Sequence, residues 1–193
     1  MNAMESASPA PVTSSCDFCE ASVPESHQHV MNTENRTIEC ACDPCAILFS
    51  NQGAGKYKRI PRTIRALPQF QMSDEEWETL VIPIDIAFLY HSSKKDGVVA
   101  LYPSPVGAVE SELDLGVWNQ IEKNNPSLAN LETDVEGVLI DRTGKNHEYF
   151  RIPIDECFRL VGMVRVAWRG FTGGPAVKQE IAQFIDSLKQ RSR

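Results

Sequence analysis

Two pairs of cysteines, each with two residues between its members, lie close together near the start of the chain. The first pair is Cys16 and Cys19, and the second pair is Cys42 and Cys45. A Cys-x-x-Cys turn can bring two thiolates to one ion, and two such turns complete a tetrahedral shell of four sulfurs. The spacing therefore predicts that these four residues bind one metal ion.

The expected metal is Zn²⁺, in a structural role. A segment of roughly 35 residues is too small for its own apolar core, and a four-sulfur zinc site supplies roughly 10–16 kcal/mol of apparent binding energy. Four thiolates leave no coordination position open for water, which disfavours a catalytic metal. Iron in a rubredoxin-like site is the alternative, because its ligand set is identical. The second pair lacks the Cys-Pro-x-Cys-Gly pattern common in rubredoxins, and this favours zinc.

Three further residues near these pairs could join or replace a ligand: Cys40, His27 and His29. Cys40 stands two residues before Cys42, so on a strand the two side chains would share a face. Cys40 could then replace Cys42 or lie beside the metal without binding it. The two histidines share a face in the same way, and such a pair is more often a supporting polar group than a pair of ligands.

The same segment predicts a small zinc module over residues 15–50. His29–Asn32 and Arg36–Ala41 suit a hairpin, and the residues after Pro44 suit the start of a short helix. A cysteine turn, a hairpin and a helix that opens with the second cysteine pair form the layout of a treble clef. If the last segment is extended instead, the same spacing gives a zinc ribbon.

Composition and charge exclude several classes of protein. The chain has 193 residues, 42% hydrophobic and 23% charged, and a formal net charge of −7, which disfavours nucleic acid as a partner. The apolar runs are shorter than the ~18 residues of a membrane span. Residues 1–14 have neither the basic nor the apolar part of a signal peptide. We therefore expect these residues to be a disordered lead, and the protein to be cytoplasmic with reduced cysteines.

The sequence after residue 50 predicts a basic linker over residues 51–72 and an α+β domain over residues 73–193. The linker contains the basic run Lys56–Arg65. Because of this run, a zinc module that contacts nucleic acid remains an alternative function. For the domain we expect a mixed sheet with helices on one face. We also expect a loop at Pro103–Gly107, leading to an acidic group of Glu110, Glu112 and Asp114.

Several local signals define elements within this domain. Ser73 and Glu76 match a capping box, and the Asp96-Gly97 pair marks a hairpin. A second hairpin is predicted around residues 142–146, and Asp114 and Asp155 are the predicted helix caps. The last predicted helix carries an apolar stripe formed by Val177, Ile181, Phe184, Ile185 and Leu188.

No residue pattern in the chain indicates catalysis. Cys157 stands alone, and the histidines outside the cysteine-rich segment are His91 and His147. A nucleophilic cysteine needs a histidine and a polarising partner, so we expect Cys157 to be a buried apolar residue. We therefore expect a non-enzymatic protein, and we identify no small-molecule substrate.

Three stretches of the chain together resemble a bacterial family of proteins, domain-of-unknown-function family 5947. They are CDFCEASVPESHQHVMNTENRTIECACDPCAILF, GVVALYPSPVGAVESELDL and IPIDECFRLVGMVRVAWRGFTGG, and the resemblance covers about residues 16–188. Members of this family are often encoded beside uptake nickel–iron hydrogenase genes. The resemblance implies an accessory or adaptor role in hydrogenase assembly or its electron-transfer context, with a hydrogenase subunit or maturation factor as partner. A rubredoxin-like iron electron carrier is the competing function.

Overall fold

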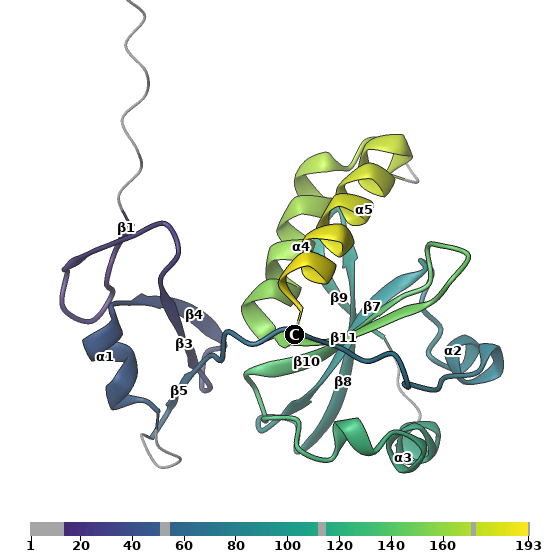
Figure 1. Ribbon diagram of the computed structural model, residues 1–193, viewed down its shortest axis with the longest axis horizontal. Helices are drawn as coiled ribbons and strands as arrows, with labels where there is room; N and C mark the ends of the chain where they lie inside the picture. Colours follow the sequence, from purple (N-terminus) through teal and green to yellow (C-terminus); the bar gives the residue numbers. More distant parts are fainter. Residues whose placement is uncertain (1–13, 51–54, 112–114, 171–172, 193) are drawn as a thin grey trace, which may run out of the picture.

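The computed structural model describes residues 14–50, 55–111, 115–170 and 173–192. A small three-stranded sheet lies near the N-terminus, and a larger six-stranded sheet with most of the helices follows it (Figure 1). This mixture confirms the predicted α+β class. The predicted disordered lead, apart from Ser14, lies outside the described residues.

The small sheet has the strand order β4-β3-β5, and both of its pairings are antiparallel. Strands β3 and β4 form the predicted hairpin, and the predicted helix follows β4 directly. A two-stranded ribbon, β1-β2, precedes the sheet and surrounds the first cysteine pair. The bounds are β1 Ser14–Ser15, β2 Ser22–Val23, β3 Gln28–Asn32, β4 Thr37–Ala41, α1 Asp43–Leu48 and β5 Tyr57–Arg59.

The large sheet has the strand order β6-β11-β10-β7-β8-β9, and every pairing in it is antiparallel. Both predicted hairpins are present, as β7-β8 and β10-β11. The sheet is therefore antiparallel rather than mixed, because tight turns join most neighbouring strands. The bounds are β6 Arg65–Ala66, β7 Ile86–Ser92, β8 Gly97–Ser104, β9 Gly107–Ser111, β10 Glu136–Asp141 and β11 Glu148–Pro153.

Helices cover both faces of this sheet, whereas the sequence analysis expected them on one face (Figure 1). Strand β7 explains the difference, because its residues Ile86–Tyr90 are buried without a polar break. Phe88 and Tyr90 join the apolar cluster of α4 and α5, whereas Ala87 and Leu89 join that of α2 and α3. The bounds are α2 Asp74–Thr79, α3 Leu115–Asn124, the 3-10 helix η1 Pro126–Leu128, α4 Ile154–Ala167 and α5 Gly174–Arg191.

The structure of the larger domain agrees with some of the predictions made from local sequence signals and not with others. The capping box is present, with the Ser73 hydroxyl accepting from the Glu76 N–H and the Glu76 carboxylate accepting from the Ser73 N–H. The predicted loop at Pro103–Gly107 is wrong in extent, because β8 runs through Ser104 and β9 starts at Gly107. The register with β7 ends at Leu101, so the missing N–H of Pro103 disturbs no pairing with that strand. Of the acidic group beside this loop, Glu110 lies in β9, whereas Glu112 and Asp114, the predicted cap of α3, lie outside the described residues.

The segment predicted to be a linker supplies one strand to each sheet. Strand β5 pairs with β3, and β6 pairs with β11. Between them, Ile60 and Ile64 are buried in the core cluster of the large domain, together with Met31 from β3. The small sheet is thus packed directly against the large domain. The boundaries of the zinc module, the linker and the α+β domain remain predictions.

Candidate metal centre

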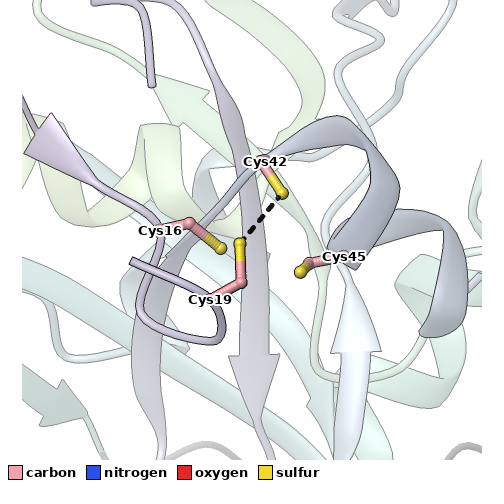
Figure 2. Close-up of side chains that lie close together, drawn as sticks. All are labelled: Cys16, Cys19, Cys42 and Cys45. Atoms are coloured by element: carbon pink, nitrogen blue, oxygen red, sulfur yellow. Dashed lines mark hydrogen bonds between the residues drawn. The ribbon is translucent and has the colours of Figure 1, made fainter. Parts of the chain in front are cut away.

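The four paired cysteines converge on one point (Figure 2). Their sulfur atoms all lie within 4.8 Å of one another, and the sulfurs of Cys19 and Cys42 are 3.6 Å apart. Tetrahedral coordination with metal–sulfur bonds of about 2.3 Å requires sulfur–sulfur distances of about 3.8 Å. All four thiols are free of disulfides. This cluster could bind a metal ion, and the donor set fits zinc and iron equally.

The first cysteine pair is held in a hydrogen-bonded turn. The Cys16 N–H donates to the Ala21 carbonyl, and the Glu20 N–H donates to the Cys16 carbonyl, each at 2.8 Å. Asp17 fixes this turn to β4, because its N–H donates to the Cys40 carbonyl at 2.8 Å and its carboxylate accepts from the Cys40 N–H at 2.6 Å. The orientation of the first pair is therefore set by the second strand of the hairpin.

The second cysteine pair is positioned by the start of α1. Cys42 is the N-cap residue of this helix, Pro44 lies in its first turn, and the Ala46 N–H donates to the Cys42 carbonyl at 2.9 Å. Proline is favoured there because its fixed φ suits a first helical turn. One helical turn brings Cys45 to the same side as Cys42. Because this segment is a helix, the arrangement follows the treble-clef layout rather than the zinc ribbon.

Three aromatic rings join the parts of this centre. Phe18 comes from the first cysteine turn, Phe49 from the end of α1, and Tyr57 from β5. Their ring centroids lie 4.9 to 5.3 Å apart. Edge and tilted contacts of this kind each contribute about 0.5–1.5 kcal/mol beyond the burial of area.

The thiols of the cluster differ in acidity. Burial opposes ionisation of Cys16, but the N–H groups of Cys42, Phe18 and Cys19 donate towards its sulfur and lower its pKa to about 6. Hydrogen bonding with the Cys42 and Cys19 sulfurs raises the pKa of Cys45 to about 12. One thiolate thus forms readily at neutral pH, and further negative charge is resisted within the cluster. A cation bound by these four thiols would offset this repulsion and displace the remaining protons.

Cys40 does not join the four-sulfur cluster. Strand β4 ends at Ala41 and the chain then turns into α1, so Cys42 leaves the face that it would share with Cys40 on a continued strand. Cys40 instead lies beside His27 and His29, and these three side chains form a separate group. Burial, together with the charges of Asp17, Glu39 and Cys16, raises the pKa of Cys40.

Asp155 is a residue of this region that the sequence analysis assigned differently. It is not the predicted cap of α4, because Pro153 is the N-cap residue and Asp155 lies in the first turn. The Asp155 carboxylate accepts a hydrogen bond from Nδ1 of His29 at 2.7 Å, and thereby ties the small sheet to α4. The two residues stand 126 positions apart, so no local pattern could have paired them.

The basic run beside the metal centre is largely engaged in contacts within the chain. Lys58 pairs with Asp134 at 3.0 Å, Lys56 with Glu34 at 3.6 Å, and Arg59 donates to the Gln28 side chain. Arg62 bonds to the Ser26 hydroxyl. Side chains occupied in this way offer fewer charges to a phosphate backbone.

Cys157 belongs to neither group of metal-binding side chains. It is fully buried on α4, where a side chain added at Gly137 would meet its sulfur at 3.3 Å. Burial raises the pKa of the Cys157 thiol well above its ordinary value. The prediction of a buried apolar residue is therefore confirmed.

Comparisons with known proteins give one match. No curated protein and no solved structure matches the chain. Within the described residues, no helix is long and apolar enough to cross a membrane. A family model, described as a family of unknown function, DUF5947, matches residues 15–192. This span contains all four converging cysteines and both sheets, and the chain therefore belongs to the family of unknown function DUF5947.

Proposed function

We propose that this protein is a non-enzymatic zinc-binding accessory or adaptor protein. The convergence of four thiols on one point carries the proposal. Four thiolates fill a tetrahedral shell and leave no position for a substrate or a reactive water, so the metal orders the chain rather than reacting. Reduced thiols of this kind persist in a cytoplasmic environment, where we place the protein.

An adaptor needs a surface for a protein partner, and α1 offers one next to the metal centre. Ile47 is 63% exposed and Leu48 is 70% exposed on this helix. The helix also carries Cys45, so metal binding would fix the orientation of both apolar side chains. Covering them against a partner would be favourable by about 25 cal/mol per Å² of apolar surface. As partner we propose a hydrogenase subunit or maturation factor, which is what the family resemblance implies.

A second candidate function is electron transfer with iron in place of zinc. Cys19 is exposed, so the cluster reaches the protein surface, as exchange of an electron with a partner requires. The experiment that separates the two is metal analysis of freshly purified protein with its visible spectrum. Zinc should be present and the protein colourless. A red protein with a reversible one-electron wave would contradict the zinc assignment and favour the electron carrier.

The ligand set is tested by substitution of single cysteines. Cys16→Ser and Cys45→Ser should each bind one metal equivalent fewer than the wild type, because each removes one of four required thiolates. Cys157→Ala is the matched control, since it removes a buried thiol outside the cluster, and it should keep the full metal content. Unchanged metal content in both cluster variants would overturn this ligand set.

The adaptor role is tested on α1. The Ile47→Glu/Leu48→Glu variant should bind zinc normally but no longer co-elute with the purified hydrogenase partner. Val166→Glu is the matched control, because Val166 is 76% exposed on α4. Equal binding by both variants would remove α1 as the docking surface. Binding that survives removal of the metal would place the docking surface on residues 73–190.

A further inference from the structure

The two faces of the small sheet have different neighbours. Side chains alternate along a strand, so Val30 points to one face, and His29 and Met31 point to the other. Val30 packs with Ala46 of α1, on the side of the four-cysteine cluster. Met31 packs into the core of the large domain, and His29 contacts Asp155 of α4. The second face is therefore the contact between the small sheet and the large domain.

A second group of metal-binding side chains lies on this second face. Cys40 in β4 is the cross-strand neighbour of His29 in β3, and His27 stands two residues before His29. One ring nitrogen from each histidine and the Cys40 sulfur lie within 4.8 Å of one another. Tetrahedral coordination needs nitrogen–sulfur and nitrogen–nitrogen distances of about 3.3–3.6 Å, which small side-chain rotations can reach.

Hydrogen bonds fix the tautomer of both histidines in the form that a ligand needs. Nδ1 of His27 lies 2.8 Å from the Pro24 carbonyl, which can only accept, so this nitrogen carries the proton. Nδ1 of His29 lies 2.7 Å from the Asp155 carboxylate and donates to it. In the neutral imidazoles, both Nε2 atoms then keep their lone pairs. A histidine that binds a metal almost always donates its other N–H to a carbonyl or a carboxylate in this way.

One of these lone pairs is buried without a partner. Nε2 of His27 is shielded from solvent and has no hydrogen-bond donor within the described residues. An acceptor withdrawn from water without a partner is energetically unfavourable. A metal ion at this point would satisfy the atom.

We propose that His27, His29 and Cys40 bind a second transition-metal ion of the zinc class at the contact between the small sheet and α4. Two neutral imidazoles and one thiolate are ligands that suit Zn²⁺. The surrounding charges also favour a cation, since the Cys40 thiolate, the Asp155 carboxylate and the nearby carboxylates of Asp17 and Glu39 are all negative. Three protein ligands leave a fourth position for water or for a donor from a partner, unlike the closed four-sulfur cluster.

The site is tested by titrating the metal-free full-length protein with Co²⁺, whose visible and near-ultraviolet bands report the ligands. The wild type should bind two equivalents. The thiolate-to-cobalt band of one equivalent should be weaker, because one thiolate replaces four. Cys40→Ser and His27→Ala should each bind one equivalent, with the four-thiolate spectrum. His147→Ala removes an exposed histidine elsewhere and should still bind two.

Asp155 is tested as a positioning residue. Asp155→Asn should weaken binding of the second equivalent by about 10–100-fold, because the carboxylate orients His29. Affinity for the first equivalent should not change, which provides an internal control for folding. Equal affinity of wild type and variant for the second ion would contradict this role.

The outcomes separate this proposal from the proposed function. Saturation of the wild type at one equivalent with a four-thiolate spectrum would overturn the second site and leave the first intact. Conversely, saturation of the wild type at one equivalent with a single-thiolate spectrum would overturn the four-cysteine cluster and leave the second site intact. Two equivalents retained by both Cys40→Ser and His27→Ala would also overturn the second site.

Discussion

The two sheets of this protein are stabilised by different means. Among the described residues, the cluster formed by the small sheet and α1 buries Val30, Ala41 and Ala46, with aromatic rings at its edge. The large sheet is buried on both faces, with an extensive apolar cluster on each. A cluster this small cannot by itself offset the entropy of ordering its chain, whereas the two clusters of the large domain can. The four converging thiols therefore lie in the region with the smaller apolar core, where a bound metal would contribute most to stability.

Removing the metal should produce the largest difference in stability between the two regions. Chelation should unfold residues 14–50 and strand β5, because it withdraws roughly 10–16 kcal/mol of apparent binding energy from a region with a small core. The large domain should stay folded. Amide hydrogen exchange measures both regions at once, and protection should disappear in the small sheet and persist in β7 and β10.

Tryptophan fluorescence gives a control for the same experiment. Trp77, Trp118 and Trp168 all lie outside the small sheet, so their emission should change little on chelation. Loss of protection along the whole chain, together with a shift in tryptophan emission, would mean that both regions unfold as one unit. Protection unchanged throughout would mean that the metal is not structural.

A core substitution should produce the converse effect in the large domain. Phe184 on α5 is fully buried, and the Arg159 guanidinium lies 4.9 Å from its ring centroid. Phe184→Ala should lower the free energy of unfolding by about 3–5 kcal/mol through lost burial and a cavity. Urea denaturation followed by tryptophan emission measures this loss. Phe184→Leu should cost less, and metal content should be unchanged in both; metal lost together with stability would show that the regions depend on each other.

A smaller effect is expected from an ion pair that joins α4 to α5. The Glu156 carboxylate accepts hydrogen bonds from Arg159 at 2.8 Å and from Arg191 at 2.6 Å. Burial opposes its ionisation, but the two guanidinium groups lower the pKa of Glu156 below the ordinary value of 4.5. Because the folded-state pKa is the lower one, this stabilisation is complete above about pH 4.5 and is lost as the pH falls through the folded-state pKa.

Glu156→Gln should therefore lower the free energy of unfolding at neutral pH by about 1 kcal/mol. The difference from the wild type should shrink as the pH falls below 4.5. Urea denaturation at neutral and acidic pH, again followed by tryptophan emission, measures it. Glu78→Gln, at an exposed position on α2, is the control. A difference that does not depend on pH would show that the Glu156 carboxylate does not act through its charge.

Local signals in the sequence were sufficient for many of the elements. The capping box at Ser73, the Asp96-Gly97 turn and the apolar stripe of α5 depend on neighbouring residues, and each forms as predicted. The convergence of the four cysteines followed from spacing alone, because each pair needs only one tight turn. Features of this kind can be predicted because each is determined by a few neighbouring residues.

Contacts between distant residues could not be predicted in the same way. Apolar stripes show that a helix has a buried side, but not which face of a sheet it covers. The pairing of β5 with β3 was hidden because its basic residues resemble a solvated linker, whereas Lys58 in fact reaches Asp134 of the large domain. The bond between His29 and Asp155 spans 126 positions and leaves no mark on either local sequence.

The position of β5 has a practical consequence for cutting this protein into pieces. A fragment that ends at Ser50 would keep all four cysteines, but β3 would lose the partner that covers its outer edge at Val30 and Asn32. A bare edge strand readily pairs with another copy of itself, so such a fragment should aggregate even when loaded with metal. A fragment that continues through Ile60 closes this edge, yet uncovers the apolar side chain of Met31. The cysteine-rich region can therefore be transplanted only together with β5 and with a new apolar surface to receive Met31 and Ile60.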